Sequence, residues 1–321
     1  MIAAIIIADW EREKGENVGF CRGPALTNWA WVDVLGQSVV GRVTDGLKRS
    51  GIDSVFVLGN QLSSLAAYTV AGRLAAPDSW SAVGTKLAKC KDEGFEAVLI
   101  ADCSTYAEFE LADLLMFHFE HGAPVTQACS ADGPIDLWVV DPSRIGGEDL
   151  RSAVREANPV CYELRGYVHQ LRSVTDFRRL VLDSFGTRSR LRPRGVEIRP
   201  GVWVADSAEL GRNARIVAPA FIGRGVRIAD ECLITRSTNV ERGSHVDFGT
   251  AVEDSSILPN TYLGIGLDLS NSVVDGKNLW NLRHDVTLEI TDPVVMRTNG
   301  TSVEESRQLG ELQDDILNLS A

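Results

Sequence analysis

The stretch VRIADECLITRSTNVERGSHVDFGTAV, residues 226–252, carries an aliphatic residue at every sixth position. The same spacing extends back to residue 198, and the residue two places before each aliphatic is small or β-branched. The aliphatic series is Ile198, Val204, Leu210, Ile216, Ile222, Ile228, Ile234, Val240, Val246 and Val252. The small series is Val196, Val202, Ala208, Ala214, Ala220, Val226, Cys232, Thr238, Ser244 and Thr250. A period of six does not fit a helix face, and hexapeptide repeats are typical of a parallel β-helix.

In such a coil the large aliphatic residue fills the interior, and the small residue lets the chain turn a crowded corner. Each coil buries its inner face only against its neighbours, so the repeats stabilise one another. After Val252 the interval shortens once by one residue, and the series continues at Ile257, Leu263 and Leu269. The sequence therefore predicts a β-helix over residues 194–285 with one change of frame.

The first half of the chain, residues 1–187, follows a different pattern, in which short apolar runs alternate with amphipathic stretches. The expected strands are Ala3–Ala8, Ser54–Leu58, Ala97–Ala101, Pro124–Ala128, Asp136–Val140 and Val160–Glu163. The expected helices are Ser38–Ser50, Ser79–Glu93, Ala107–His121, Glu148–Ala157 and Ser173–Ser184. Thr105 and Glu108 have capping-box spacing for the third helix, and Ser173 is suited to cap the last. The alternation predicts an α/β domain with a mostly parallel sheet and helices on both faces.

The last segment, residues 286–321, is expected to be a C-terminal extension that contains a helix over residues 302–319. Ser302 and Glu305 have capping-box spacing. The helix would carry an apolar stripe made of Val303, Leu309, Leu312, Ile316 and Leu319. We expect this helix to pack over the end or flank of the β-helix, and an oligomer contact is the alternative.

Composition excludes some functions. The chain has 321 residues, enough for two domains with full cores, and a net charge of −12 argues against nucleic-acid or anionic-membrane binding. Its 6 cysteines are scattered without a CxxC pair, so we expect reduced thiols rather than a disulfide scaffold or zinc site. Met1 leads straight into an apolar run without a basic segment, so no signal peptide is expected. These features favour a cytoplasmic protein.

Four stretches of the first half resemble the sugar-1-phosphate nucleotidyltransferases, also called nucleotide-sugar pyrophosphorylases. VLIAD, residues 98–102, looks like the family's strand that ends in Gly-Asp, and LGQS, residues 35–38, matches its Gly-Lys-Pro turn. IDLWVVDPSR, residues 135–144, is similar to its strand and "DP" turn. GYVHQLRSVTDF, residues 166–177, lies where the family has a strand, an Asp-Ile-Gly-Thr turn and a helix. The resemblance implies a Rossmann-like nucleotidyltransferase domain followed by a left-handed parallel β-helix of hexapeptide repeats.

The resemblance places the nucleotide-binding loop directly after the first strand, where the family has a glycine-rich turn that ends in arginine. Here Ala8 matches that turn, but Asp9, Trp10 and Arg12 replace the glycines and Lys14 stands at the arginine position. Bulky side chains and a carboxylate lie where a polyanion would approach bare backbone. Ala8, Asp9, Arg12 and Lys14 are therefore weak candidates for nucleotide contact.

The same resemblance implies Mg²⁺ as the cofactor, held by two carboxylates. Asp102 matches the first of them, but Gln170 stands where the family has the second. A neutral amide is a poor Mg²⁺ ligand. The family's lysine after proline is also missing at Pro24-Ala25-Leu26, and its Glu-Lys-Pro motif has no counterpart between Thr126 and Asp136. Trp29 and Trp31, which follow, suit packing better than stacking on a base.

Three functions remain open. The first is a catalytically degenerate nucleotidyltransferase-like protein, a regulatory or scaffolding partner in nucleotide-sugar or polysaccharide metabolism that binds a nucleotide-sugar or sugar phosphate. The second is an active sugar-1-phosphate nucleotidyltransferase with a site rebuilt from Asp102 and Asp9, with Arg12 or Lys14 on phosphate. The third is a hexapeptide acyltransferase with His245 as general base, although a plain surface histidine is the simpler interpretation. The resemblance also implies a homo-oligomer formed through the β-helix.

Overall fold

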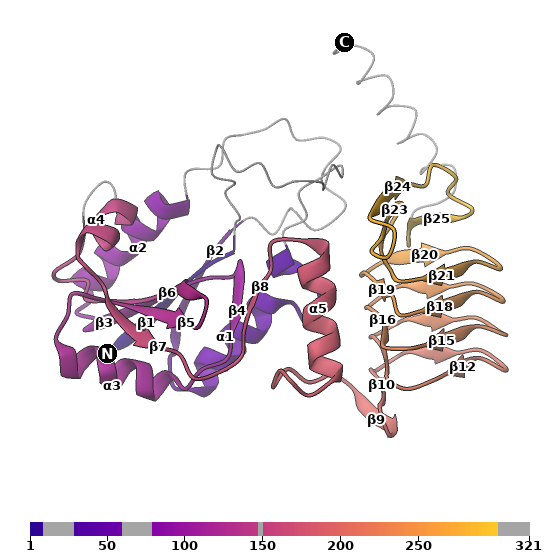
Figure 1. The fold of residues 1–321 in the computed structure, drawn as a ribbon, viewed down its shortest axis with the longest axis horizontal. Helices are drawn as coiled ribbons and strands as arrows, with labels where there is room; N and C mark the ends of the chain where they lie inside the picture. Colours follow the sequence, from indigo (N-terminus) through magenta and orange to yellow (C-terminus); the bar gives the residue numbers. More distant parts are fainter. Residues whose placement is uncertain (9–28, 60–78, 147–149, 301–321) are drawn as a thin grey trace, which may run out of the picture.

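The computed structural model describes residues 1–8, 29–59, 79–146 and 150–300, and its first half is a sheet covered by helices on both faces (Figure 1). Its strands are β1 (Ile2–Ile7), β2 (Ser54–Leu58), β3 (Ala97–Asp102), β4 (Thr105–Ala107), β5 (Val125–Ser130), β6 (Gly133–Val140), β7 (Val160–Glu163) and β8 (Val168–Gln170). Its helices are η1 (Trp29–Trp31), α1 (Val39–Arg49), α2 (Ser79–Asp92), α3 (Leu111–His121), α4 (Leu150–Glu156) and α5 (Val174–Phe185). The predicted α/β class is confirmed.

The main sheet has the strand order β2-β1-β3-β6-β5-β7. Strand β1 runs parallel to both β2 and β3, and β5 runs parallel to β7. Strand β6 is antiparallel to both of its neighbours because a tight turn joins β5 directly to β6. The described sheet is therefore mostly parallel, as predicted, with β6 as its one antiparallel strand, and β6 lies next to the carboxyl end of β3.

Alternate residues of β1 enter two separate cores, one on each face of the sheet. Ala4 and Ile6 pack with side chains of α1 and α3, whereas Ile5 and Ile7 pack with side chains of α2 and α4. This strand is apolar on both faces, as expected for a strand buried between two layers of helices. Its burial explains the continuous apolar run at the start of the chain.

Side-chain caps fix the starts of α1 and α5. Ser38 Oγ accepts a hydrogen bond from the amide of Gly41 at 3.2 Å, and Ser173 Oγ accepts one from Asp176 at 3.1 Å. These bonds satisfy amides that a helix leaves without partners in its first turn. The predicted cap at Ser173 is confirmed.

The predicted start of the third helix is wrong. Residues Thr105–Ala107 form β4, which pairs with β8, and α3 begins only at Leu111. Glu108 does not close a capping box, because its carboxylate accepts hydrogen bonds from Ser189 Oγ at 2.6 Å and from the amide of Arg190. Glu108 therefore binds Ser189, which is 81 positions away in the chain, instead of capping the start of a helix.

The second half winds repeatedly through three sheets. Its strands are β9 (Val196–Arg199), β10 (Val202–Val204), β11 (Glu209–Leu210), β12 (Arg215–Ile216), β13 (Ala220–Ile222), β14 (Arg227–Ile228), β15 (Leu233–Thr235), β16 (Thr238–Val240), β17 (His245–Val246), β18 (Ala251–Glu253), β19 (Ser256–Ile257), β20 (Thr261–Leu263), β21 (Asp268–Ser270), β22 (Ser272–Asp275), β23 (Asn278–Asn281), β24 (Val286–Glu289) and β25 (Met296–Thr298). From β10 to β19 each strand pairs in parallel with the third strand after it, so successive strands visit the three sheets in turn. Figure 1 shows the result as a stack of coils.

The predicted interior series is buried along this stack. Ile222, Ile228, Ile234, Val240 and Val246 are at most 2% exposed and belong to one apolar cluster. The first members are less buried; Leu210 is 44% exposed because no coil precedes it. The six-residue spacing therefore predicted both the parallel sheets and the residues that fill them.

The predicted change of frame is also confirmed. Leu233 pairs with Ala251, eighteen residues on, whereas Ala251 pairs with Asp268, seventeen residues on. The missing residue is lost at one corner of the coil. At that corner the preceding coil has two left-handed residues, Arg236 and Ser237. The shorter coil has one in their place, Asp254, with φ 44°. Because the corner is shorter, the interior series continues at Ile257, which remains fully buried.

A third apolar cluster joins the two halves of the molecule. Phe177 and Val181 of α5 lie in one cluster with Phe221 and Trp280 of the coils, and all four are buried. The Trp29 ring stacks on that of Phe177 with centroids 5.0 Å apart, so its predicted packing role is confirmed. Figure 1 shows α5 between the sheet and the stack of coils.

Arg178 of α5 is the main polar link across this junction. Its guanidinium donates to Ser256 Oγ (3.0 Å), Asn239 Oδ1 (3.3 Å), the Ser237 carbonyl (2.9 Å) and Asp254 Oδ1 (2.7 Å). The side chain is only 3% exposed. Four acceptors from two successive coils therefore hold one buried cation, which fixes the level at which α5 meets the stack.

Glu241, which follows β16, forms a second polar link. Its carboxylate accepts from the amides of Leu35 at 2.8 Å and Gly36 at 2.9 Å, and from Asn239 Nδ2 at 2.7 Å. Leu35 and Gly36 both adopt left-handed conformations, which turn two successive N–H groups toward the carboxyl group of Glu241. Burial, with a contribution from Asp33, raises the pKa of Glu241 to about 8.

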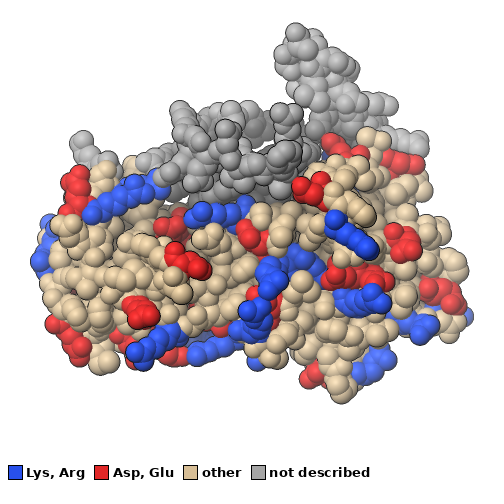
Figure 2. Space-filling model, in the orientation of Figure 1, with Lys and Arg blue, Asp and Glu red and all other residues tan. Residues whose placement is uncertain are grey.

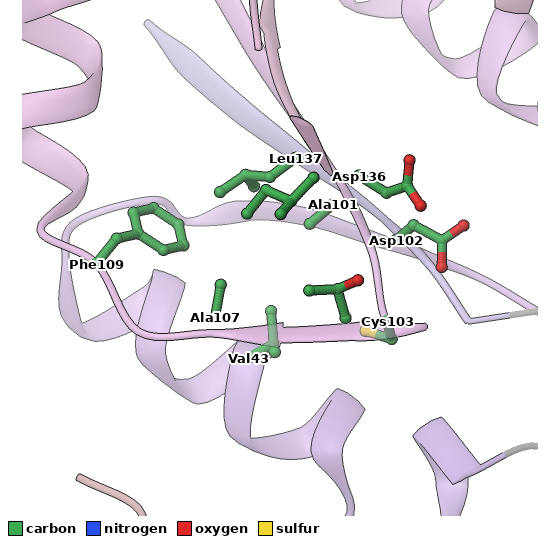
Figure 3. Close-up of a pocket in the computed structure, with 10 residues that line it drawn as sticks. Val43, Ala101, Asp102, Cys103, Ala107, Phe109, Asp136 and Leu137 are labelled. Carbon is green, nitrogen blue, oxygen red and sulfur yellow. The ribbon is translucent and has the colours of Figure 1, made fainter. Parts of the chain in front are cut away.

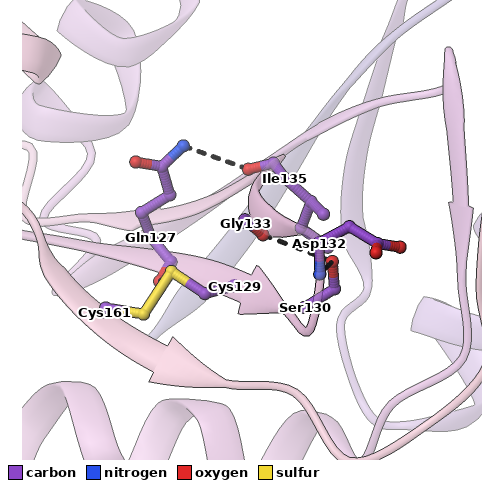
Figure 4. Close-up of a disulfide and its surroundings, with 7 residues drawn as sticks. All are labelled: Gln127, Cys129, Ser130, Asp132, Gly133, Ile135 and Cys161. Atoms are coloured by element: carbon purple, nitrogen blue, oxygen red, sulfur yellow. Dashed lines mark hydrogen bonds between the residues drawn. A yellow bond between two sulfur atoms is a disulfide. The ribbon is translucent and has the colours of Figure 1, made fainter.

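The prediction that the cysteines are reduced is wrong for one pair. Cys129 of β5 and Cys161 of β7 form a disulfide with Cα atoms 6.0 Å apart (Figure 4). The two residues are 32 positions apart in the chain, but β5 and β7 are neighbours in the sheet. The cysteine spacing could not reveal this pairing. Cys90, Cys103 and Cys232 are free and buried.

In Figure 2, the Lys and Arg side chains on this face alternate with Asp and Glu. Within the described ranges, every helix is too short or too polar to cross a bilayer. The predicted C-terminal helix, residues 302–319, lies outside the described part of the chain.

Candidate functional site

The carboxyl ends of β1 and β3 meet at the point where the strand order of the sheet reverses. After β1 the chain passes through α1 to β2 on one side, and then through α2 to β3 on the other side of β1. In α/β sheets, ligands bind beyond the carboxyl ends of the strands at such a switch point. Asp102 is the last residue of β3 and lies opposite Ile7 of β1.

A small pocket of about 30 Å³ lies at this edge of the sheet (Figure 3). It has room for about two water molecules or one cation. Its lining residues are Val43, Ala101, Asp102, Cys103, Thr105, Ala107, Phe109, Ile135, Asp136 and Leu137. Figure 3 shows the carboxylates of Asp102 and Asp136 side by side at one end of the pocket and the Phe109 ring at the other. Besides the two carboxylates, Thr105 and Cys103 bring a hydroxyl and a thiol to an otherwise apolar lining.

Asp136 is a site residue that the sequence did not reveal. Ala101 of β3 pairs with Leu137 of β6, so Asp102 and Asp136 are adjacent across two antiparallel strands. The sequence signal is an aspartate between two apolar residues, Ile135 and Leu137, which are both buried. That signal becomes informative only once β6 is known to run antiparallel beside β3.

The pocket raises the proton affinity of Asp102. Burial is the main cause that raises its pKa to about 6, and the negative charge of Asp136 adds to it. Hydrogen bonding by Ser104, whose amide donates to Asp102 Oδ1 at 2.8 Å, and the charge of Arg151 act in the opposite direction. Two adjacent carboxylates in a small pocket gain stability when a divalent cation offsets their repulsion, and their oxygens are the ligands that Mg²⁺ prefers.

The segment that contains Gln170 lies beside this site but does not line the pocket. Gln170 of β8 pairs with Thr105 of β4, and the Leu171 amide donates to the Ser104 carbonyl at 2.6 Å. The position at which the resemblance implies a second carboxylate thus lies next to the pocket. The carboxylate that lines the pocket beside Asp102 is Asp136, from a different strand.

Of the predicted nucleotide-binding residues, only Ala8 is described. Its amide donates to the Leu58 carbonyl at 2.7 Å, and its carbonyl accepts from Trp31 Nε1 at 3.0 Å. Both of its backbone groups are therefore used in holding the end of β1. Asp9, Arg12 and Lys14 lie outside the described residues.

No protein-family model matches the chain, and no curated protein matches it either. The likeness to the sugar-1-phosphate nucleotidyltransferases thus rests on the sequence stretches given above. What the fold adds is the position of Asp102 at a switch point and a neighbouring carboxylate.

His245, the candidate base of an acyltransferase, lies on β17 in the coils. Its ring meets that of Tyr262 edge to face with centroids 5.4 Å apart, and burial lowers its pKa. The Tyr262 hydroxyl donates to Asp247 Oδ2 at 2.7 Å, and the Arg297 guanidinium lies over the Tyr262 ring. Tyr262 thus has a stacked cation and a carboxylate acceptor, and this packing explains the position of His245 without a catalytic role.

Proposed function

We propose that this protein is a nucleotidyltransferase-like protein that binds a Mg²⁺–nucleotide-sugar complex at Asp102 and Asp136. In this proposal it acts as a regulatory or scaffolding partner in nucleotide-sugar or polysaccharide metabolism. The observation that carries the proposal is the pair of adjacent carboxylates at the switch point of the sheet. Ligands of doubly wound α/β domains bind at this location.

We infer that the first half is a nucleotidyltransferase domain and that the coils form a left-handed β-helix. The four sequence stretches support the first inference, and three parallel sheets filled by a hexapeptide series support the second. A homo-oligomer formed through the coils remains a prediction from the resemblance.

The described residues fit the magnesium ion that the resemblance implies. Asp102 and Asp136 would hold it, and Ser104 orients Asp102 through its backbone amide. When bound, Mg²⁺ neutralises phosphate oxygens and the charge that develops during phosphoryl transfer. Phe109 and Leu137 exclude water from the other end of the pocket, which strengthens the interaction of the carboxylates with a cation.

A second candidate function is supported by Asp136. It supplies a second carboxylate in place of the one lost at Gln170, so an active nucleotidyltransferase with a rebuilt site is the main competitor. The two candidates share the site and differ in turnover. Release of pyrophosphate from a nucleoside triphosphate and a sugar-1-phosphate therefore distinguishes them.

Changing either aspartate to asparagine should weaken Mg²⁺-dependent binding. We expect Asp102→Asn and Asp136→Asn each to lower the affinity for a nucleotide-sugar at least about tenfold, because loss of a ligand costs more than loss of its outer partner. The measurement is titration calorimetry with a panel of nucleotide-sugars and nucleoside triphosphates, each with Mg²⁺ and with EDTA.

Asp132→Asn is the matched control. Asp132 lies in the exposed turn between β5 and β6, the hairpin that carries Asp136, so the variant removes an equal charge without touching the pocket. Binding that persists in EDTA, or that both pocket variants retain, would contradict the proposal. Pyrophosphate release by the unmodified protein that both pocket variants lose would replace the regulatory role with the enzymatic one.

A further inference from the structure

Residues at the ends of successive strands of the largest sheet of the coils form a column that faces the α/β half. Glu241, Leu258 and Asp275 lie in this column, because the Glu241 amide donates to Ile257 and the Leu258 amide donates to Val274 in the next coil. Glu241 and Asp275 are both buried, with exposed fractions of 0% and 4%. Their surroundings differ: Glu241 has three N–H donors, whereas Asp275 Oδ1 is buried and has no hydrogen-bond partner.

Asp275 is also the first member of a row across the end of the stack. It pairs with Asn278 of β23, which in turn pairs with Glu289 of β24. Directly opposed residues of antiparallel strands project from the same face, so three oxygen-bearing side chains lie next to one another. Asn278 Oδ1 is buried without a hydrogen-bond partner as well. Glu289 lies at the rim, where Oε1 accepts from Lys277 Nζ at 2.6 Å.

Two adjacent buried oxygens without a donor are costly, and one of them belongs to a carboxylate. Burial alone raises the pKa of Asp275 to about 7, since no nearby charge compensates it. The row offers only oxygen ligands: a carboxylate, a carboxamide and a second carboxylate at the rim. Such a set, with flexible geometry and mixed carboxylate and amide oxygens, is typical of Ca²⁺ sites.

We propose that Asp275, Asn278 and Glu289 form a cation site that takes Ca²⁺. The site joins β22, β23 and β24, the last strands of the largest sheet, and it is separate from the pocket at Asp102. The bound cation satisfies the two buried oxygens and ties the final hairpins to the stack. The bound cation therefore stabilises the C-terminal end of the stack of coils.

Terbium luminescence tests this site directly, because Tb³⁺ occupies oxygen-rich Ca²⁺ sites and is excited by nearby tryptophan. Trp280 lies two residues from Asn278 on the same strand and is 8% exposed. We expect the full-length protein to show tryptophan-sensitised Tb³⁺ emission that Ca²⁺ displaces. Asp275→Asn should weaken Ca²⁺ binding at least about tenfold, and Glu289→Gln, a change at the exposed rim, should weaken it less.

Two controls separate this site from other acidic groups. Asp285→Asn removes an equal charge from the exposed loop between β23 and β24 and should keep the emission. The Asp102→Asn background removes any emission from the other pair of carboxylates, so the Ca²⁺-displaceable emission that remains there reports the site at Asp275. A Ca²⁺-dependent rise in Tm that Asp275→Asn abolishes would support the site independently. No displaceable emission with Ca²⁺ up to about 10 mM, beyond the weak end of protein calcium sites, would overturn the proposal. Emission unchanged in both Asp275→Asn and Glu289→Gln would overturn it too.

Discussion

Replacing Arg178 with alanine is expected to lower the free energy of unfolding by about 3 kcal/mol. The change removes a 3%-exposed cation and deprives Ser256 Oγ and the Ser237 carbonyl of the hydrogen bonds that Arg178 donates, whereas Asn239 Oδ1 still accepts from Ser256 Oγ. This loss is at the low end of the range of destabilisation expected when a buried ion pair is broken, because the Asp254 side chain is 38% exposed and stays hydrated. Chemical denaturation followed by both fluorescence and far-UV circular dichroism measures the loss.

The same variant should also uncouple the two halves of the molecule, because Arg178 links α5 to two coils at once. We expect the single unfolding transition to split into two. The control is Arg179→Ala, the next residue along α5, whose side chain is 57% exposed; it should cost less than about 1 kcal/mol, because the Asp183 carboxylate that it pairs with keeps Arg188 and the Tyr167 hydroxyl as partners. Equal effects of the two substitutions would show that Arg178 is not an anchor.

Replacing Glu241 with glutamine is expected to flatten the dependence of stability on pH. The folded-state pKa is about 8, above the ordinary value of 4.5, so the folded protein holds a proton that the unfolded chain has lost between these values. Stability from this group is therefore complete below pH 4.5 and is lost as pH rises toward 8. One proton corresponds to a slope of at most about 1.4 kcal/mol per pH unit. Denaturation at closely spaced pH values measures it.

Other groups titrate in the same direction, so the comparison between variants decides the source of the slope. Asp102 and Asp275 also have raised pKa values, and Asp33 lies beside Glu241. The control is Glu209→Gln on β11, where the glutamate side chain is 69% exposed and pairs with Arg227 at the surface. If Glu241→Gln and Glu209→Gln keep the same slope as the unmodified protein, the buried carboxylate is not its source.

The coils were predictable from sequence because a solenoid repeats the same short pattern of interior and corner residues in every coil. Each sixth residue meets the same surroundings, so the interior residues and the change of frame after Val252 are visible in one chain. The contacts that join the halves do not repeat. Nothing in the local sequence of Glu241 indicates that its partners are Leu35 and Gly36, 206 and 205 positions away.

The candidate site was only half predictable for a related reason. Asp102 follows an apolar strand, and a carboxylate at a strand end is a local signal. Asp136 becomes its neighbour only because β6 runs antiparallel beside β3, and the alternation of strands and helices favoured a parallel arrangement. The disulfide has the same origin, because Cys129 and Cys161 meet through the order of strands in the sheet.

The shortened corner at Asp254 determines which coil α5 meets. A stack of identical eighteen-residue turns would offer α5 the same groups at every level, and docking one coil too high or too low would bury a similar area. Asp254 and Glu241 each occur in a single coil. Arg178 binds the same corner in two successive coils, the longer one before Asp254 and the shortened one at Asp254. The corner is first shortened at Asp254 and is equally short at Asn271 in the next coil, so the change from the longer to the shorter corner works as a positional marker along the stack. Coils could be added at either end of the stack while the two halves keep the same alignment.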